Sequence, residues 1–378
     1  MTRRRTRPKR VVGRSHVGER FEVVCGPIAH GGFAVARTEG RVVFVRHSLP
    51  GERVVAEVTE GNEGDRFWRA DAVEILQAAP GRVAVPCPVA GPGGCGGCDF
   101  QHVDLATQRE LLGLVVAEQL QRIAGLTREV VVEPASPEDD GFGWRTRVDY
   151  VHSADGFGLR AHRSHRVVPV EHCLIATPEA QPAMTPPTRH RVRHREYDVS
   201  AGGFWQPHRD APETLVSAML AAANVRPSDR ILDLYAGVGL FAGFLGEAAP
   251  QGRVWAVEGD PAASKLSVAN LSDLPNVESI HADVATWLTS ATEPAEVDLV
   301  VLDPPRAGAK AKVIAGIASR SPRAIVLVSC DPAAFARDTK LLGQNGYELT
   351  GLRAFDLFPM THHVECVALL TKTGSDLR

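Results

Sequence analysis

The segment RILDLYAGVGLFAG, Arg230–Gly243, decides the fold of this chain. An apolar run of strand length leads into a turn with two glycines, and a helical pattern follows the turn. The same alternation recurs three times downstream, in RVWAVEGD, VDLVVLDPP and AIVLVSCDP, which begin at Arg253, Val297 and Ala324. Strands that alternate with helices predict a mostly parallel sheet with helices on both faces.

Two more apolar runs close this pattern, ELTGLRAFDLF from Glu348 and HHVECVALLT from His362. The connection between them is too short for a helical crossover, so we expect an antiparallel pair of strands at the sheet edge. Residues 201–378 are therefore predicted to form a Rossmann-like α/β domain with a mixed seven-stranded sheet.

Upstream, residues 13–78 contain five short segments with period-two alternation: FEVVCG, GFAVAR, RVVFVRH, ERVVAEVTE and FWRADAVEIL. Glycine-bearing turns separate these segments, and helical periodicity is absent. This pattern predicts a small closed barrel of the OB type, a fold that often binds oligonucleotides. A small β-domain without that role is the alternative. Residues 1–12 are predicted to be a basic tail.

Residues 79–200 are predicted to form a small central α+β domain. A Pro/Gly-rich stretch over 79–97 marks its start, and the amphipathic segment LATQRELLGLVVAEQLQRIAGL follows from Leu105. We expect a helix over 105–124 that ends near Gly125 and packs on the α/β domain. TRVDYVHS and FGLRAH indicate strands, whereas PEAQPAMTPPTRH, from Pro178, is predicted to be a loop.

The overall composition is that of an ordinary globular protein, with 44% hydrophobic and 23% charged residues. No apolar run approaches the ~20 residues that a membrane span needs. The first segment, MTRRRTRPKR, lacks the apolar core of a secretory signal. We therefore expect a cytoplasmic protein.

Positive charge is concentrated in three stretches, although the net charge of the chain is −3. Six of the first ten residues are Arg or Lys, and RAHRSHRVV and RHRVRHR begin at Arg160 and Arg189. All three stretches lie outside the α/β domain and predict contacts with RNA phosphates. Solvated charged faces are the alternative for each of them.

The turn after the first strand of the α/β domain predicts a nucleotide-type cofactor site. Ligands of such sheets lie outside the carboxyl ends of the strands, and Gly237 and Gly239 let the backbone approach a ligand closely. Glu258 ends the next strand and is expected to accept hydrogen bonds from ribose hydroxyls. Asp283 follows the third strand and suits an adenine amino group. On these residues alone, NAD is the competing ligand.

Cys330 is predicted to be the last residue of the strand that begins at Ala324, at the edge where the cofactor is expected. The sequence from Asp303 to Arg306, DPPR, lies at the carboxyl end of the strand beside it. A buried cysteine is commonly an inert apolar residue, but a thiol at this edge is within reach of substrate. Because the thiolate is the reactive form, we expect a cationic neighbour to lower the pKa of Cys330, and Arg306 is the candidate.

A thiol at this place suits methylation of uracil at C5, a carbon that is a poor nucleophile in an electron-poor ring. A thiolate that adds to C6 creates an enolate, and C5 then attacks the methyl group of a sulfonium donor. A base must remove the C5 proton so that the thiolate leaves by elimination. In FPMTHHVECVALL, Glu365 is the predicted base and His363 is the alternative, while Cys366 is assigned to the core.

With these residues, the chain resembles the RNA 5-methyluridine methyltransferase family, specifically members with an N-terminal TRAM domain and an iron–sulfur cluster. The motifs DLYAGVGLF, DPPRAG, VSCDPAAFARD and FPMTHHVE stand in the family's order. The resemblance implies an S-adenosylmethionine-dependent enzyme with Cys330 as nucleophile and Glu365 as base, and Arg306 is assigned to substrate support.

The resemblance also implies a set of cofactor contacts. FWQPH, the segment that holds Gln206, departs from the family's usual run of phenylalanine, phenylalanine, glutamine, valine and asparagine. The implied contacts come from the two turn glycines and five other residues: Gln206, Tyr235, Gly237, Gly239, Glu258, Asp283 and Asp303.

Seven cysteines occur, and their clustered spacing in a chain without a signal peptide does not indicate disulfides. Four thiolates in CPVAGPGGCGGC and EHC would serve structural zinc or an iron–sulfur cluster equally well, and four unligated thiols are a third interpretation. The first spacing is longer than the family's usual one. The resemblance implies that a structural [4Fe–4S] cluster is bound by Cys87, Cys95, Cys98 and Cys173.

A uracil inside a helix hides C6 in the stack, so the target must lie in a loop or be flipped out. Family members with both barrel and cluster tend to act on large-subunit ribosomal RNA, so the resemblance implies 23S rRNA. The alternatives are a tRNA 5-methyluridine methyltransferase and a noncatalytic RNA-binding protein that retains the fold. An RNA 5-methylcytosine methyltransferase would usually carry a second cysteine near the aspartate-proline motif. We expect a monomer without an obligate protein partner.

Overall fold

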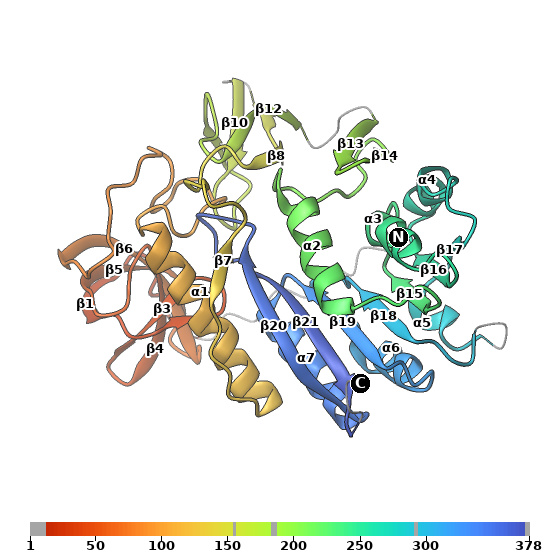
Figure 1. Cartoon of the computed structure of the whole chain (residues 1–378). Helices are drawn as coiled ribbons and strands as arrows, with labels where there is room; N and C mark the ends of the chain where they lie inside the picture. Colours follow the sequence, from red (N-terminus) through yellow and green to blue (C-terminus); the bar gives the residue numbers. More distant parts are fainter. Residues whose placement is uncertain (1–12, 154–155, 183–186, 291–293, 375–378) are drawn as a thin grey trace. The chain divides into compact units, whose positions relative to one another are not determined.

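The computed structural model describes residues 13–153, 156–182, 187–290 and 294–374, which form two compact units (Figure 1). The first unit contains the described chain up to Gln108, together with Arg160–Val168 and Met360–His362. The second unit contains Arg109–Leu159, Pro169–Pro359 and the chain from His363 onward.

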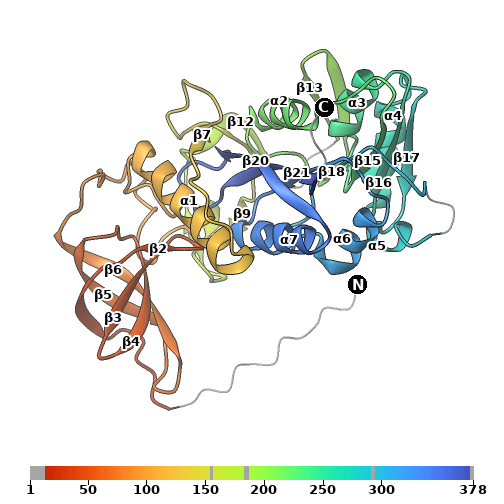
Figure 2. The same cartoon turned by 60° about the horizontal axis from the view of Figure 1, so that its bottom comes forward.

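A curled six-stranded sheet with the order β1-β5-β6-β4-β3-β2 forms the first unit (Figure 2). Period-two alternation buries one face of each strand, as Val43 and Val45 of β4 and Val54 and Ala56 of β5 illustrate. All five predicted strands are present, and the two-residue β2 is added to them. The bounds are β1 Arg20–Val24, β2 Ile28–Ala29, β3 Phe33–Thr38, β4 Arg41–Arg46, β5 Arg53–Glu60 and β6 Phe67–Gln77.

An eight-stranded sheet with the order β17-β16-β15-β18-β19-β21-β20-β7 forms the centre of the second unit. The strands from β17 to β19 run parallel, and β21 is antiparallel to both β19 and β20. The bounds are β7 Val132–Pro134, β15 Arg230–Leu234, β16 Arg253–Glu258, β17 Val277–His281, β18 Leu299–Leu302, β19 Ala324–Ser329, β20 Tyr347–Asp356 and β21 Glu365–Lys372.

The seven predicted strands are all present, but the predicted antiparallel pair is not at the edge. The short strand β7, from the central segment, pairs in parallel with β20 and becomes an eighth strand. The outer edge of β20 would otherwise present unpaired N–H and C=O groups, and β7 satisfies part of that edge.

Helices cover both faces of this sheet, as predicted (Figure 2). The helices α2, α3 and α4 lie on one face and α5, α6 and α7 on the other. Because both faces are covered, β18 and β19 are buried at every position and consist of continuous apolar runs. The bounds are α2 Ala211–Ala223, α3 Leu240–Ala248, α4 Pro261–Asn270, α5 Val284–Trp287, α6 Lys310–Ala318 and α7 Pro332–Gln344.

The predicted helix end near Gly125 is confirmed. Helix α1, Leu105–Gln119, continues as a π-helical turn, η1, over Leu120–Ala124. Gly125 then adopts a left-handed conformation with φ 72°, and its N–H bonds the carbonyl oxygens of the last turn. Within the second unit, η1 packs against α7.

Short sheets make up much of the remaining chain, and two of them correct a prediction. The segment from Pro178 was predicted to be a loop, but its first residues, up to Pro182, belong to β12, which pairs in parallel with β8. Its last residues, from Thr188, belong to β13, which pairs with β14. Pro178 lies where the register of β12 and β8 is irregular, and proline is tolerated at such a bulge because no ladder hydrogen bond needs its N–H. The bounds are β8 Arg145–Val148, β9 Val151–Ser153, β10 Gly156–Arg160, β11 Val167–Pro169, β12 Ala176–Pro182, β13 Thr188–Val192 and β14 Arg195–Val199.

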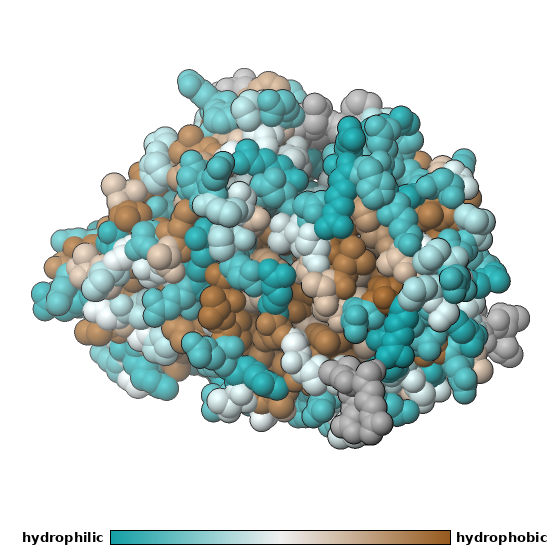
Figure 3. All heavy atoms as spheres, in the orientation of Figure 1, coloured by the Kyte–Doolittle hydropathy of each residue, from teal (hydrophilic) through white to brown (hydrophobic). Residues whose placement is uncertain are grey.

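The surface of the described residues is mostly hydrophilic in the view of Figure 3. Hydrophobic atoms gather over the second half of α1 on this face, and Leu114 of that helix is 57% exposed. Among the helices of the described ranges, none has the length and apolarity needed to cross a membrane.

Candidate active site

The strand ends bring the predicted catalytic and cofactor residues to one edge of the sheet in the second unit. The strands β15, β16, β18 and β19 all run in the same direction, so their carboxyl ends meet at that edge. The residues at or just after these ends are Tyr235, Glu258, Asp303 and Cys330.

The antiparallel strand β21 adds Glu365 to the same edge. It begins at Glu365, and its register pairs Ser329, the last residue of β19, with Cys366. Glu365 is therefore next to Cys330 on the neighbouring strand. Glu365 is 3% exposed, and Cys366 is fully buried in the core, where it was predicted.

The glycine turn between β15 and α3 orients Glu258. Gly237 and Gly239 have positive φ values of 57° and 94°, and the N–H of Gly237 donates to Glu258 Oε2 at 2.8 Å. The N–H of Asp260 donates to Glu258 Oε1 at 2.6 Å. A Cβ built at Gly237 would meet no heavy atom within 4 Å, so the turn leaves open space for a ligand.

Asp283 and Tyr235 have opposite protonation preferences. Hydrogen bonds from the side chain and backbone of Thr286, at 2.7 and 2.8 Å, lower the pKa of Asp283. This carboxylate is therefore ionised and fixed at the start of α5. Burial raises the pKa of Tyr235 to about 12, so its hydroxyl is a neutral hydrogen-bonding group at physiological pH.

Gln206 reaches the strand-end cluster although its FWQPH segment departs from the family's motif. Its Nε2 lies 3.5 Å from Asp303 Oδ2, and the residue is 8% exposed. Burial raises the pKa of Asp303 to about 7, so this carboxyl is partly protonated at neutral pH. The amide of Gln206 thus meets a carboxyl group at the edge where the cofactor was predicted.

The surroundings of Cys330 favour the protonated thiol. Burial raises the pKa of Cys330 to about 12, and the negative charges of Glu365 and Asp303 act in the same direction. Arg306 lowers the pKa of the thiol, as predicted, but burial and the two carboxylates outweigh this charge. In the protein alone, the pKa of Cys330 is therefore raised, whereas the sequence analysis expected it to be lowered.

Glu365 is also held in its neutral form, and His363 lies on the Arg306 side of the site. Burial raises the pKa of Glu365, Asp303 raises it further, and Arg306 acts in the opposite direction. Arg306 Nη2 lies 3.3 Å from His363 Nε2, and the His363 ring packs on Phe358 with centroids 5.7 Å apart. His363 is therefore a partner of Arg306, whereas Glu365 is the carboxyl group beside the thiol.

Asp338 supports the DPPRAG loop and was missed by the sequence analysis. This residue of α7 is 2% exposed, and its carboxylate accepts hydrogen bonds from the N–H groups of Ala309 at 2.6 Å and Lys310 at 3.2 Å. A Cβ at Gly308, where φ is 77°, would meet Asp338 Oδ2 at 2.6 Å. The available signal was an acidic residue within the helical segment of VSCDPAAFARD.

The basic stretch from Arg189 is largely neutralised within the second unit. Most of its arginines form ion pairs with carboxylates of the same unit, so this stretch leaves little unpaired positive charge for RNA phosphates. In the first unit, Arg163 of the stretch from Arg160 pairs with Glu60 at 3.2 Å, and the basic residues 1–12 lie outside the described residues. The pairs of the later stretch are Arg189 with Asp198, Arg193 with Glu213, and Arg195 with both Glu247 and Asp273.

In the first unit, two of the predicted metal-ligand sulfurs accept hydrogen bonds. The N–H of Gly97 donates to Cys95 Sγ at 3.4 Å, and Gln101 Nε2 donates to Cys98 Sγ at 3.2 Å. Across the described ranges, however, no group of three or more His, Cys, Asp or Glu side chains is placed to hold a metal ion. Cys173 belongs to the second unit, and the predicted cluster is not confirmed.

Three family models match parts of the chain. The TRAM domain model matches residues 14–73, and the model of tRNA (Uracil-5-)-methyltransferase matches residues 291–373. A model of ribosomal RNA adenine dimethylase matches residues 212–317. The first match covers the sheet of the first unit, and the second covers the strands that hold Asp303, Cys330 and Glu365.

Full-length relatives are RNA methyltransferases. An uncharacterized RNA methyltransferase of Streptomyces avermitilis is 44% identical over 96% of this chain and 100% of its own length. The 23S rRNA (uracil(1939)-C(5))-methyltransferase of Chromohalobacter salexigens is 30% identical over 91% of this chain and 88% of its own length.

A solved structure shares the fold. It is the tRNA (uracil-54, C5)-methyltransferase of Pyrococcus abyssi in complex with S-adenosyl-L-homocysteine, which is 22% identical with a TM-score of 0.69. The likeness covers 92% of this chain and 99% of the other.

Proposed function

This chain belongs to the RNA (uracil-5-)-methyltransferase family, and we propose that it methylates C5 of one uridine in 23S ribosomal RNA through a transient bond to Cys330. The observation that carries this proposal is the register of β19 and β21, in which Cys330 and Glu365 are neighbours. They lie at the edge with the glycine turn, where such sheets bind their ligands. A nucleophile and a base at one edge are what the reaction requires.

In the proposed reaction, the Cys330 thiolate adds to C6 of the uracil, and the π electrons move to give an enolate with a nucleophilic C5. C5 takes a methyl group, which S-adenosylmethionine supplies, as the bond to the donor sulfur breaks. Glu365 then accepts the C5 proton, and the electrons of that C–H bond expel the Cys330 sulfur from C6. The RNA leaves with 5-methyluridine, and the proton remains on Glu365.

The protein alone lacks enough positive charge near Cys330 and Glu365 to favour their ionised forms, and the methyl donor is a cation. Burial and mutual repulsion favour the neutral forms of Cys330 and Glu365, and Arg306 alone does not reverse this. A cation bound at the same edge favours the thiolate and the carboxylate. We infer that the nucleophile and the base become competent when the donor is bound.

Residues around the glycine turn fit the methyl donor. Glu258 is oriented by two backbone N–H groups and presents a carboxylate suited to ribose hydroxyls, and Asp283 presents an ionised carboxylate suited to an amino group. The open space at Gly237 allows close backbone approach. The proposed contacts are Gln206, Tyr235, Gly237, Gly239, Glu258, Asp283 and Asp303.

The sheet of the first unit offers side chains suited to RNA. Three partly exposed rings of β3, β4 and β6 meet edge to face, with centroid distances of 6.1 Å for Phe33–Phe44 and 5.3 Å for Phe44–Phe67. The guanidinium of Arg69 lies 5.0 Å from the Phe67 centroid. Aromatic rings beside arginine stack on unpaired bases, so we propose that this sheet binds RNA near the target uridine.

The choice of ribosomal RNA is supported by the relative from Chromohalobacter salexigens, which is named for 23S rRNA and is 30% identical to this chain. The alternative is tRNA, for which the matching family model is named. Nucleoside mass spectrometry of 23S rRNA and of tRNA from a deletion strain separates the two. Loss of one 5-methyluridine from 23S rRNA supports the proposal, and loss from tRNA alone selects the alternative.

We also propose that Cys87, Cys95, Cys98 and Cys173 bind a structural [4Fe–4S] cluster, with zinc as the alternative. The N–H groups that point at Cys95 and Cys98 support it, because hydrogen bonds to sulfur stabilise thiolate ligands. Anaerobically purified protein should contain about four irons per chain and lose them on Cys95→Ser. A colourless protein with zinc would reject the cluster, and Cys25→Ser is the matched control.

The mechanism predicts different outcomes for its two central side chains. Cys330→Ala should abolish methylation because no nucleophile remains, whereas Glu365→Gln should accumulate a covalent RNA–protein adduct because the C5 proton is not removed. Methylation is measured with labelled S-adenosylmethionine, and the adduct as a slow band on a denaturing gel. Cys366→Ala, which removes a neighbouring core thiol, should methylate normally. Normal methylation by the Cys330→Ala protein would exclude the mechanism.

A further inference from the structure

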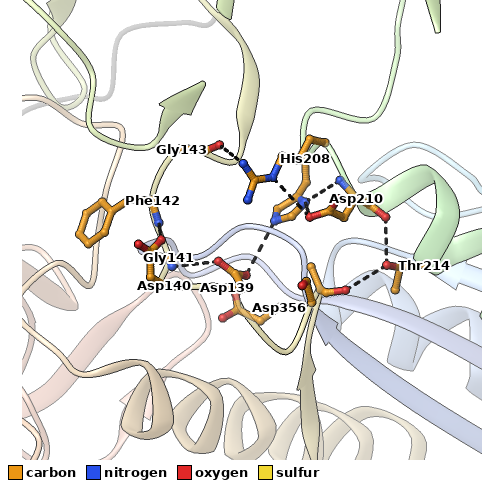
Figure 4. A network of polar contacts seen from close by, with 12 residues as sticks. Asp139, Asp140, Gly141, Phe142, Gly143, His208, Asp210, Thr214 and Asp356 are labelled. Carbon is orange, nitrogen blue, oxygen red and sulfur yellow. Dashed lines mark hydrogen bonds and ion pairs between the residues drawn. The ribbon is translucent and has the colours of Figure 1, made fainter. Parts of the chain in front are cut away.

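A buried polar network surrounds His208 in the second unit (Figure 4). The His208 ring is 1% exposed and stacks on Trp144, with centroids 5.5 Å apart and planes tilted by 11°. Its Nε2 lies 3.8 Å from Asp139 Oδ2. Asp356, at the end of β20, is fully buried in the same network, and Arg109 of α1 donates to it at 3.3 Å.

The hydrogen bonds define the tautomer of His208. Its Nδ1 accepts the N–H of Asp210 at 3.0 Å, so that nitrogen carries no hydrogen. The hydrogen of the neutral ring is therefore on Nε2, which faces the carboxylate of Asp139.

The loop that contains Asp139 is tied to the segment that contains His208. The N–H of Gly141 donates to Asp139 Oδ1 at 2.8 Å, which fixes the carboxylate within its own turn. Thr214 Oγ1 donates to the Ala135 carbonyl at 3.3 Å, and Arg209 Nη1 to the Gly143 carbonyl at 3.2 Å. Both ends of loop 135–143 are thus held against the start of α2, and the Asp139–His208 contact lies between them.

The same segment leads directly to the proposed cofactor site. Thr146 donates its N–H to the Pro207 carbonyl at 2.8 Å, and Arg209 donates its N–H to the Trp144 carbonyl at 3.0 Å. This pairing holds 207–209 along the start of β8. Gln206 immediately precedes it, and the Gln206 amide faces Asp303.

We propose that His208 is a positioning residue, which together with Asp139 holds the segment 206–209 so that the Gln206 amide faces Asp303 at the methyl-donor site. The proposal rests on the proposed function, because it assumes that Gln206 contacts the donor. His208 touches neither donor nor RNA itself. The family's usual run has asparagine where FWQPH has His208. In this chain, Asp139 of loop 135–143 supplies the carboxylate that faces this histidine.

Two substitutions of His208 test its two ring nitrogens separately. His208→Asn keeps an acceptor where Nδ1 meets the Asp210 N–H but removes the N–H toward Asp139. His208→Gln keeps a donor near the position of Nε2 and removes the acceptor. If Asp139 is the partner that matters, His208→Asn should weaken binding of S-adenosylhomocysteine about tenfold, and His208→Gln should stay within about threefold of the wild type.

The readouts are calorimetric affinity for S-adenosylhomocysteine and the KM and kcat for S-adenosylmethionine. The KM of His208→Asn should rise about tenfold while kcat at saturating donor stays within about twofold. Asp139→Asn should give the same KM change, and the double variant His208→Asn with Asp139→Asn should be no worse than either single variant. His194→Asn, at an exposed histidine, is the control.

Equal loss of affinity in the Gln and Asn variants would overturn the proposal, and so would unchanged affinity in His208→Asn. Additive losses in the double variant would also overturn it, because the two residues would then act independently. These outcomes differ from failure of the proposed function. In that case, the wild-type protein would bind S-adenosylhomocysteine but methylate no uridine, or would not bind it at all.

Discussion

Cys330, Glu365 and Asp303 share an environment that favours their neutral forms. Glu365 is buried and Cys330 and Asp303 are half-buried at the same sheet edge. Negative charge on Glu365 or Asp303 raises the pKa of Cys330, and negative charge on Asp303 raises that of Glu365. Arg306 is the cation that acts against this repulsion in the protein alone. A thiol with a pKa of about 12 is almost entirely protonated at neutral pH. As long as the pH stays below the pKa, raising the pH by one unit increases the thiolate fraction about tenfold.

This balance predicts different effects of two substitutions on the reactivity of Cys330. Glu365 is held in its neutral form in the protein alone, so Glu365→Gln should leave the rate of alkylation by iodoacetamide at pH 8 within about twofold of the wild type. Arg306→Ala removes the positive neighbour, raises the pKa of the thiol, and should slow alkylation about tenfold. The rate is measured by mass spectrometry of the peptide that contains Cys330.

The alkylation experiment has an internal control in Cys366, which is fully buried and should stay unmodified in all three proteins. Between pH 7 and pH 9, the wild-type rate should rise about tenfold per pH unit, because the pKa lies above this range. A rate that levels off within the range would show that the thiol titrates there and that its environment is not the one described.

At the scale of elements, one antiparallel strand makes the site. A parallel final strand would start at the opposite edge and carry Glu365 away from Cys330. Because β21 runs against β19, its first residue meets the residue after the end of β19. Backbone hydrogen bonds then fix the loops between strands and helices. Two backbone N–H groups donate to the Glu258 carboxylate, and the Asp338 carboxylate accepts the N–H of Ala309.

The sequence allowed prediction of those elements whose signal is local. The strands β18 and β19 are apolar throughout because helices cover both of their faces, and the end of η1 is marked by Gly125. Their motifs then led to Cys330 and Glu365, which the structure brings together.

Other elements are defined by distant partners and could not be predicted. The three residues of β7 become a strand only because β20 offers an edge, and β12 becomes a strand only because Ala176, Gln181 and Pro182 pair with β8. Asp338 and His208 lie in the segments VSCDPAAFARD and FWQPH, but their roles depend on N–H groups and carboxylates far away in the chain. The pKa of Cys330 depends likewise on how many carboxylates surround it.

At the scale of the whole molecule, the distribution of charge decides which arginines are available for RNA. The net charge is −3, and three arginines of the stretch from Arg189 pair with carboxylates. An arginine that is already paired gains less from a phosphate, because the existing ion pair must be broken. Six of the first ten residues are basic, and no acidic residue lies among them.

Removal of residues 1–12 should therefore weaken RNA binding more than substitution of the paired arginines does. Each phosphate contact with a single strand contributes about 0.7 to the slope of log affinity against log salt, so loss of six charges lowers the slope by at most about 4. Fluorescence anisotropy with a labelled 23S rRNA fragment over a salt series measures it. The double variant Arg189→Ala with Arg193→Ala is the control and should nearly keep the wild-type slope. An unchanged slope in the truncated protein, with a reduced slope in the control, would assign the phosphate contacts to the paired arginines and overturn the prediction.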